Sequence, residues 1–171
     1  MNQYYHLPHP EGKIWDVGAG GAVVRGDRVL MVRKTYGVGK GRWAIPSGLV
    51  EHEELLDEAA AREVFEETAI RAEVISLLAV RTRYVDLGGA VYVVFKMRPL
   101  SGEPTPDGVE VDAARYFSAE ELLALADHEI FALSRHAALA ALRDAIGLVE
   151  TPCPSASGPA YRAFVAPSEL S

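Results

Sequence analysis

One stretch of the chain decides its fold, and it reads Gly48-Leu-Val-Glu-His-Glu-Glu-Leu-Leu-Asp-Glu-Ala-Ala-Ala-Arg-Glu-Val-Phe-Glu-Glu-Thr-Ala-Ile70. Eight acidic residues lie between Glu51 and Glu67. Carboxylates packed this closely repel one another, so a chain that concentrates them usually gives them a cation to bind. The charged residues also recur at helical spacing beside an apolar face. The stretch therefore predicts a helix that carries a cation site.

The helix is predicted to run from Leu55 to Thr68. Its apolar side is predicted to consist of Leu56, Ala60, Ala61, Val64 and Phe65. Because a helix turns about 100° per residue, Glu63 and Glu67 are one turn apart and can meet at one ion. Carboxylate oxygens are hard ligands, which suit Mg²⁺ or Mn²⁺ better than Zn²⁺. Charge count alone favours a different interpretation, a solvated surface helix rich in glutamate.

The full spacing resembles the Nudix box, in which a glycine, a glutamate, an Arg-Glu pair, a Glu-Glu pair and a late glycine stand at fixed intervals. The matching residues here are Gly48, Glu54, Arg62, Glu63, Val64, Glu66, Glu67 and Ile70. Flanking features extend the resemblance over roughly residues 17–146. Ala69 departs from the pattern, because it stands where the family has glycine. A left-handed helix end costs a residue other than glycine about 1 kcal/mol. Ser47 also replaces a glycine found in many members.

The resemblance implies a role for each box residue. The implied metal ligands are the Gly48 carbonyl, Glu63, Glu66 and Glu67, with Glu66 binding either directly or through water. Arg62 is expected among the catalytic residues and can hold a carboxylate through a charge-assisted hydrogen bond, whereas Glu54 is expected to support the loop. Two candidates for the general base remain, Glu63 and the later Glu110. Glu110 can equally be an ordinary loop carboxylate.

The activity implied is metal-dependent hydrolysis of a diphosphate linkage in a nucleoside diphosphate joined to another moiety, with Mg²⁺ or Mn²⁺ as cofactor. ADP-ribose, a nucleoside triphosphate, a dinucleoside polyphosphate and a nucleotide sugar all stay open as substrates. Candidate substrate contacts are Arg33, Arg42, Trp43, Arg81, Arg83 and Tyr84. Arginines can bind phosphates, although strand geometry turns many such side chains to solvent. Trp43 can stack on a base or belong to the core.

Strand, helix and loop patterns alternate along one domain and predict an α+β fold. By resemblance this is the Nudix fold, an α/β/α sandwich with a mixed β-sheet and the loop-helix-loop box. Strands are expected within residues 20–24, 28–33, 73–84, 89–97 and 109–117, and a loop over 99–108. A capping-box signal at Ser118 predicts a short helix. A longer helix is expected from Ala132 to Ile146, ended by Gly147.

The chain has 171 residues, which fits one domain. The expected division is an N-terminal arm (1–16), the Nudix domain (17–150) and a tail rich in Pro, Ser and Gly (151–171). The net charge of −7 argues against binding a nucleic acid polymer or an anionic membrane. The single cysteine, Cys153, fits a reducing compartment. With neither a signal peptide nor an apolar span in the sequence, a cytoplasmic location is expected. Tyr161–Val165 in the tail is a candidate surface for a homodimer.

Two other functions compete with hydrolysis. One is a Nudix-fold module that senses a nucleotide without turnover. Ala69 gives this reading slight support, but the intact Arg62-Glu63 and Glu66-Glu67 pairs oppose it. The other is an isomerase of the isopentenyl-diphosphate type. That chemistry calls for a catalytic cysteine in the core, and the only cysteine is Cys153 in the tail.

Overall fold

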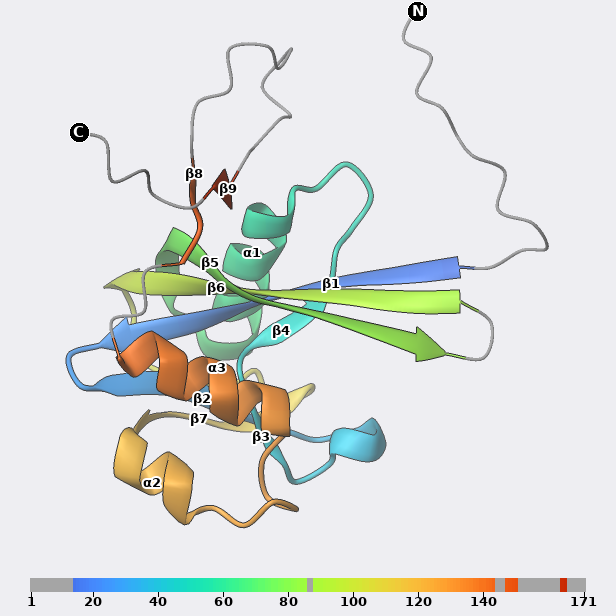
Figure 1. Cartoon of the computed structure of the whole chain (residues 1–171). Helices are drawn as coiled ribbons and strands as arrows, with labels where there is room; N and C mark the ends of the chain where they lie inside the picture. The colour runs from blue at the N-terminus through green and yellow to red at the C-terminus, as the bar shows by residue number, and fades with distance from the viewer. Residues whose placement is uncertain (1–13, 86–87, 144–146, 151–163, 166–171) are drawn as a thin grey trace, which may run out of the picture.

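A seven-stranded sheet forms the centre of the computed structural model, which describes residues 14–85, 88–143, 147–150 and 164–165 (Figure 1). The main strand order is β3-β2-β1-β6-β5, with β4 beside β1 and β7 beside β2. The strands are β1 (Ile14–Arg25), β2 (Arg28–Lys34), β3 (Trp43–Ala44), β4 (Ser47–Leu49), β5 (Arg71–Val85), β6 (Gly88–Ser101) and β7 (Val111–Ser118). β1 and β6 are parallel and the other pairs are antiparallel, so the sheet is mixed, as the sequence predicted.

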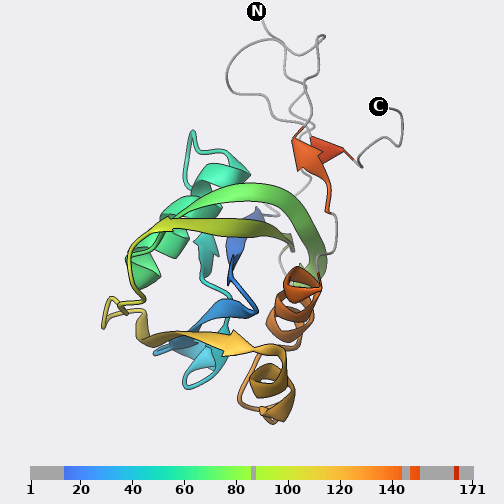
Figure 2. The ribbon, with the colours of Figure 1, turned by 90° about the vertical axis from the view of Figure 1, so that its left-hand side faces the viewer.

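Helices cover both faces of this sheet. They are α1 (Leu56–Thr68), α2 (Ala119–Ala124) and α3 (Ala132–Leu142), and a 3₁₀ turn, η1 (Gly37–Gly39), lies between β2 and β3 in the chain. Figure 2 shows α1 on one side, and α2 and α3 on the other. The predicted α/β/α sandwich is therefore confirmed. Ser118 caps α2 in the predicted capping box, because its side chain accepts a hydrogen bond from the Glu121 amide at 3.2 Å.

Two apolar layers hold the helices on the sheet. Val64 of α1 packs with Phe95 and Met97 on one side. Phe117 and Ala138 belong to the layer on the other side. Fully burying a side chain as large as phenylalanine contributes roughly 1.5–3 kcal/mol. These contacts fix α1, and therefore its acidic residues, relative to the strands.

The buried face of α1 differs from the prediction. It consists of Ala59, Ala60, Glu63, Val64, Glu67 and Thr68. Phe65 was expected on this face, but it is 42% exposed, and the Arg71 guanidinium lies 4.6 Å from its ring centroid. The helix is rotated so that its buried stripe includes two carboxylates. Glu63 and Glu67 are therefore buried, whereas Glu66 of the same helix stays exposed.

Two element boundaries also differ from the expectation. β1 begins at Ile14, inside the segment 1–16 that was predicted as an arm, because its first residue pairs in parallel with Gly88 of β6. At its other end, β6 continues to Ser101, into the predicted loop 99–108, where it pairs with Arg71 of β5. Long-range pairing extended both strands beyond their local sequence signals.

The predicted end of the last long helix is wrong. α3 ends at Leu142, and residues 144–146 of the predicted segment lie outside the described part of the chain. Gly147 does not cap the helix. Its neighbour Leu148 exchanges backbone hydrogen bonds with Leu77 of β5 at 2.7 and 3.0 Å, and a side chain at Gly147 would collide with the Leu77 carbonyl. The chain therefore leaves the helix to pair with the sheet.

Most of the predicted tail, residues 151–163 and 166–171, lies outside the described residues. Its described part is β9 (Phe164–Val165), which pairs with β8 (Val149–Glu150). The Phe164 ring lies 5.3 Å from that of Phe95, so it packs on the core of its own domain. Within the described residues, no helix combines the length and apolar character needed to cross a membrane.

Candidate active site

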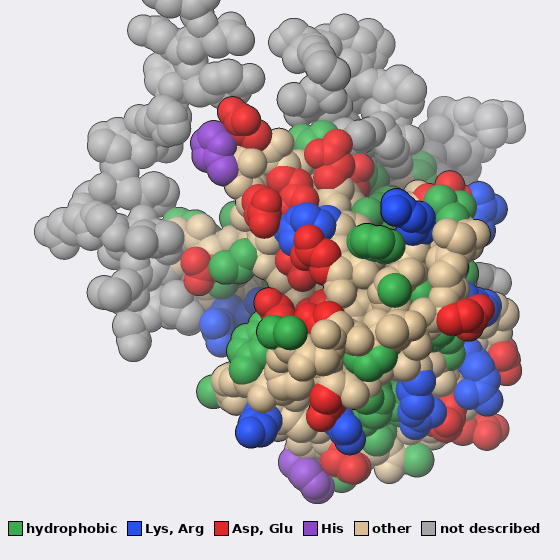
Figure 3. All heavy atoms as spheres, turned by 180° about the vertical axis from the view of Figure 1, so that it is seen from behind, with side chains coloured by type: hydrophobic (Ala, Val, Ile, Leu, Met, Phe, Trp, Pro, Cys, Tyr) green, Lys and Arg blue, Asp and Glu red, His purple; other side chains and the backbone are tan. Residues whose placement is uncertain are grey.

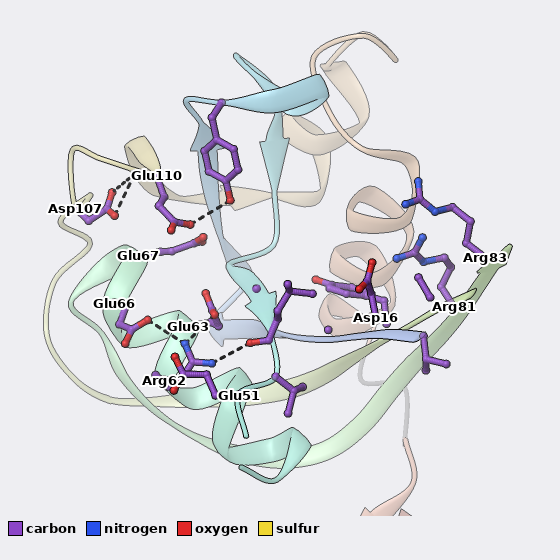
Figure 4. Close-up of a pocket in the computed structure, with 18 residues that line it drawn as sticks. Asp16, Glu51, Arg62, Glu63, Glu66, Glu67, Arg81, Arg83, Asp107 and Glu110 are labelled. Atoms are coloured by element: carbon purple, nitrogen blue, oxygen red, sulfur yellow. Dashed lines mark hydrogen bonds and ion pairs between the residues drawn. The ribbon is translucent and has the colours of Figure 1, made fainter. Parts of the chain in front are cut away.

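A cavity of about 630 Å³ lies beside α1, and we call it the acidic cavity. It is lined by seven acidic residues, namely Asp16, Glu51, Glu63, Glu66, Glu67, Asp107 and Glu110. Figure 4 shows Glu63, Glu66, Glu67 and Glu110 gathered in one part of the cavity. Asp16, Arg81 and Arg83 lie at the other end (Figure 4). The cavity is thus acidic at one end and carries two guanidinium groups at the other.

Glu67 is the most deeply placed carboxylate of the acidic end, with 2% of its surface exposed. Burial raises its pKa to about 7, although the nearby Lys34 opposes this rise. Lys34 Nζ contacts Glu67 Oε1, and the Ser47 amide donates to Oε2 at 3.3 Å. The carboxylate is therefore held between β2 and β4 at the cavity wall.

Glu63 lies one helical turn before Glu67 and is 8% exposed. Burial raises its pKa, while Arg62 favours the charged form. Its carboxylate fills the space that a side chain at position 48 would need. Glycine is therefore required at Gly48 so that the β4 backbone can approach the Glu63 carboxylate closely.

Arg62 organises the carboxylates around it. Its guanidinium donates to Glu54 at 2.8 and 2.9 Å, to Glu63 at 2.8 Å and to Glu66 at 3.0 Å. It also donates to the Leu49 carbonyl at 3.1 Å. The hydrogen bond from Arg62 lowers the pKa of Glu54, which also accepts from the Glu51 amide at 3.0 Å. Arg62 was expected to hold one carboxylate, and it holds three.

The donor set at the acidic end fits a hard divalent cation by its chemistry. Glu63, Glu66 and Glu67 offer carboxylate oxygens, and Gly48 brings the β4 backbone against them. Glu66 keeps 56% of its side chain exposed, so it is accessible from the cavity. Among the described residues, no three side chains of metal-binding type converge on one point. Instead, Arg62 neutralises Glu63 and Lys34 neutralises Glu67.

Ala69 ends α1 as the family glycine would. Its φ and ψ of 58° and 13° are left-handed, and its amide donates to the Phe65 carbonyl at 2.8 Å. The helix end is therefore preserved despite the side chain, at a cost of about 1 kcal/mol.

A tight turn presents Glu110 to the acidic cavity. The Asp107 carboxylate accepts hydrogen bonds from the amides of Val109, Glu110 and Val111 at 2.9 to 3.2 Å. Burial alone would raise the pKa of Asp107, but these amides lower it overall. The Tyr36 hydroxyl donates to Glu110 Oε2 at 3.1 Å, and burial together with Glu110 raises the pKa of Tyr36 to about 12. Tyr36 therefore stays a donor and orients the Glu110 carboxylate.

Comparison with known proteins agrees with this geometry. The NUDIX domain model matches residues 15–137 of the chain. The chain belongs to the Nudix hydrolase family. A relative from Methanocaldococcus jannaschii named ADP-ribose pyrophosphatase is 32% identical over 132 residues, which cover 75% of either chain. The human protein named nucleoside diphosphate-linked moiety X motif 6 is 36% identical over 90 residues, 50% of this chain but only 28% of that protein. A crystal structure of a MutT Nudix hydrolase from Burkholderia pseudomallei matches 74% of this chain and 97% of its own, with a TM-score of 0.64 and 27% identity.

The candidate substrate residues of this Nudix hydrolase fall into two groups. Arg81 and Arg83 of β5 line the acidic cavity. Three other candidates, Arg33, Arg42 and Trp43, do not line it. Arg33 pairs with exposed Asp112 at 2.7 Å. Arg42 donates to the carbonyls of Asp127 and Ile130 at 3.1 and 2.9 Å.

The remaining two candidates lie on strands. Trp43 packs on Phe117 with ring centroids 4.7 Å apart, so it belongs to the core and does not face the cavity. Tyr84 lies on β5, and its side chain is outside the part of the chain that the structure describes.

The structure of the Nudix hydrolase adds cavity residues that sequence reasoning missed. They are Asp16, Tyr36, Asp107 and Tyr92. Asp16 reaches the cavity because the β1–β6 and β6–β5 registers place it in one row with Ala90 and Arg83. No local motif marks such a row, because it depends on the pairing of distant strands. Acidic side chains gather on the face of the molecule opposite to that of Figure 1 (Figure 3).

Proposed function

We propose that this Nudix hydrolase cleaves a diphosphate linkage in a nucleoside diphosphate joined to another moiety, with Mg²⁺ or Mn²⁺ as cofactor. One observation carries the proposal. Two buried carboxylates, Glu63 and Glu67, lie against the β4 backbone at one end of a cavity whose other end holds Arg81 and Arg83. An anionic diphosphate needs both features, a cation on its reacting phosphate and guanidinium groups on its remaining charge. The names of the archaeal and human relatives support the same class of substrate.

The residues that would hold the cation are Gly48, Glu63, Glu66 and Glu67. The cation would supply charge stabilisation at the phosphate and a more acidic water. Arg62 would keep two of these glutamates in place, because its guanidinium already bonds to Glu63 and Glu66. Lys34 would hold the buried charge of Glu67 while the site is empty.

Glu110 is the general base in this proposal, and Glu63 is the alternative. Water attacks one phosphorus, so that a new P–O bond forms while the bond from that phosphorus to the bridging oxygen breaks. The proton of the water passes to the carboxylate, and the bridging oxygen leaves on the other phosphate. Tyr36 donates to Glu110 Oε2, which leaves Oε1 to accept the proton.

A nucleotide screen tests the proposal. The protein is incubated with Mg²⁺ or Mn²⁺ and ADP-ribose, a nucleotide sugar, a nucleoside triphosphate or a dinucleoside polyphosphate, and the products are identified. Release of two phosphate-bearing products from a nucleoside diphosphate derivative supports the proposal. Tight binding without phosphate release at any metal concentration would favour the alternative function, a nucleotide sensor. A cytoplasmic location and a homodimer stay predictions from the sequence.

A further inference from the structure

A second cavity of about 480 Å³ adjoins the acidic cavity, and we call it the apolar cavity. The same four side chains line both: Tyr36, Arg81, Arg83 and Tyr92. The two cavities therefore meet at this set of residues. A ligand longer than a diphosphate can extend from one cavity into the other.

The two cavities differ in chemistry. The apolar cavity is lined by Val38, Phe131 and Leu133, and its cations are Lys34 and the two shared arginines. No aspartate or glutamate is among the described residues that line it. An apolar wall beside guanidinium groups suits a flat, uncharged ring attached to a phosphate.

Phe131 offers such a ring a fixed surface. The Arg42 guanidinium lies 4.3 Å from the Phe131 ring centroid. Gly39 approaches the ring edge so closely that a Cβ there would lie 2.7 Å from Cζ. The Phe131 amide donates to the Trp43 carbonyl at 3.1 Å, so the backbone is held as well. The side chain is half-buried, and the residue lines the cavity.

Arg81 and Arg83 stand between Phe131 and the acidic residues. Neither forms a hydrogen bond or ion pair with another described residue, and Arg81 Nε is buried without a partner. The Arg81 guanidinium lies 5.6 Å from the Tyr92 ring centroid, which keeps it at the junction of the cavities. Buried donors without a partner are costly. An anionic group of the ligand would satisfy them.

We propose that the apolar cavity binds the nucleobase of the substrate, stacked on Phe131, while the phosphates cross the junction at Arg81 and Arg83 toward the acidic cavity. This inference rests on the proposed function and adds the orientation of the substrate. The sequence left Trp43 open between stacking on a base and belonging to the core; the structure packs Trp43 on Phe117, whereas the Phe131 ring lines the apolar cavity. Stacking on an aromatic ring tolerates every base, so we expect the Phe131 ring to contribute to the binding of adenine and uracil nucleotides alike.

Steady-state kinetics of Phe131→Ala test the proposal with three substrates. ADP-ribose and UDP-glucose carry a base. The third, a diphosphate diester that joins two riboses through their 5-oxygens, carries none. We expect KM for both nucleotides to rise about ten- to a hundredfold, because one stacking contact is lost. The kcat for the nucleotides and the KM for the base-free diester should stay within about twofold. Phe131→Tyr should restore the nucleotide KM. An equal rise for all three substrates, or no rise at all, would overturn the proposal.

Tyr116→Ala is a matched control. Tyr116 is also half-buried and lies under an arginine, with Arg25 4.7 Å from its ring centroid, but it lines neither cavity. The KM values of the Tyr116→Ala variant should equal those of the wild type for all three substrates. If Phe131→Ala fails to fold, Phe131→Leu keeps most of the volume while removing the ring, and should give the same rise in KM.

Calorimetry separates this inference from the proposed function. If the wild type hydrolyses none of the three substrates, binding of AMP and of ribose 5-phosphate still tests the apolar cavity. We expect the wild type to bind AMP more tightly than ribose 5-phosphate, and Phe131→Ala to lose that preference. Equal binding of the two ligands by the wild type would overturn the inference whatever the turnover.

Discussion

Arg62 and Glu54 form a bidentate ion pair, in which Nε donates to Oε1 at 2.8 Å and Nη2 to Oε2 at 2.9 Å. The third nitrogen of the same guanidinium bonds to Glu63 and Glu66. Two of the proposed metal ligands therefore depend on a side chain that is itself fixed by Glu54. The loop before α1 and the acidic face of α1 form one connected unit.

The first prediction concerns this unit. Arg62→Lys should weaken Mg²⁺-dependent turnover, because an ammonium group cannot make the fork of parallel hydrogen bonds. Outer-shell changes of this kind cost roughly 10- to 100-fold in metal affinity or activity. The measurement is the Mg²⁺ concentration for half-maximal rate. Arg25→Lys alters the exposed pair with Glu103 and should leave that concentration unchanged. Equal values for both variants would contradict the role of Arg62.

The second prediction separates the two groups of arginines. Arg81→Gln should raise KM about tenfold or more, because a charge-assisted hydrogen bond contributes about 1.5–3 kcal/mol. Arg33→Gln should leave KM unchanged, since this exposed side chain pairs with Asp112. Both variants lose one positive charge, so a general field effect would change KM for both. A similar rise in the two variants would mean that Arg81 does not contact substrate.

The sequence could bring Gly48, Glu63 and Glu67 together because these residues lie in one local segment, while their role as metal ligands stays a prediction. The spacing of Gly48, Glu63 and Glu67 follows from one loop and one helix, so no distant contact is needed to bring them together. The same segment marked Ala69 as the irregular position and left open whether the helix end is reshaped; the structure shows that the left-handed end is kept. Local geometry is sufficient for this part of the molecule.

Other features depend on pairing that no local pattern reveals. The helix α1 packs on the sheet in an orientation that leaves Phe65 exposed and buries two glutamates. The registers of β1, β6 and β5 brought Asp16 and Arg83 into one row. The choice between core and cavity for Trp43 was settled by its contact with Phe117. The substrate end of the site was therefore much less predictable than the acidic end.

A third prediction follows from the helix end. Ala69→Gly should stabilise the fold by about 0.5–1 kcal/mol, because glycine adopts φ of 58° without strain. Thermal unfolding should show a melting temperature higher by about 1 to 4 °C. Ala61→Gly, in the interior of the same helix, should lower it instead. A lower melting temperature for Ala69→Gly would refute the strain at this position.

The fourth prediction is that the stability of the fold depends on pH through Glu121, which lines neither cavity. The Ser118 amide and Arg115 lower the pKa of Glu121 to about 2. In the unfolded chain the pKa of a glutamate is about 4.3. The charged Glu121 carboxylate therefore stabilises the fold fully above that pH, and this stabilisation is lost as the pH falls toward 2. Glu121→Gln should therefore melt at a lower temperature than the wild type at pH 7. The two proteins should melt alike near pH 2. A difference that stays constant with pH would contradict the assignment.

The most direct test of the account is the turnover of Glu67→Gln with ADP-ribose and the other panel substrates, measured with and without Mg²⁺ or Mn²⁺. Glu67 is 2% exposed, and glutamine keeps an oxygen for the Ser47 amide, so the fold should survive. Glu73→Gln, at an exposed ion pair with Arg98, is the control. We predict that the wild type and the control turn over only with the divalent ion, and that Glu67→Gln loses more than about 100-fold of this rate. Wild-type turnover by Glu67→Gln, or turnover by the wild type that needs no divalent ion, would contradict a metal site at this carboxylate.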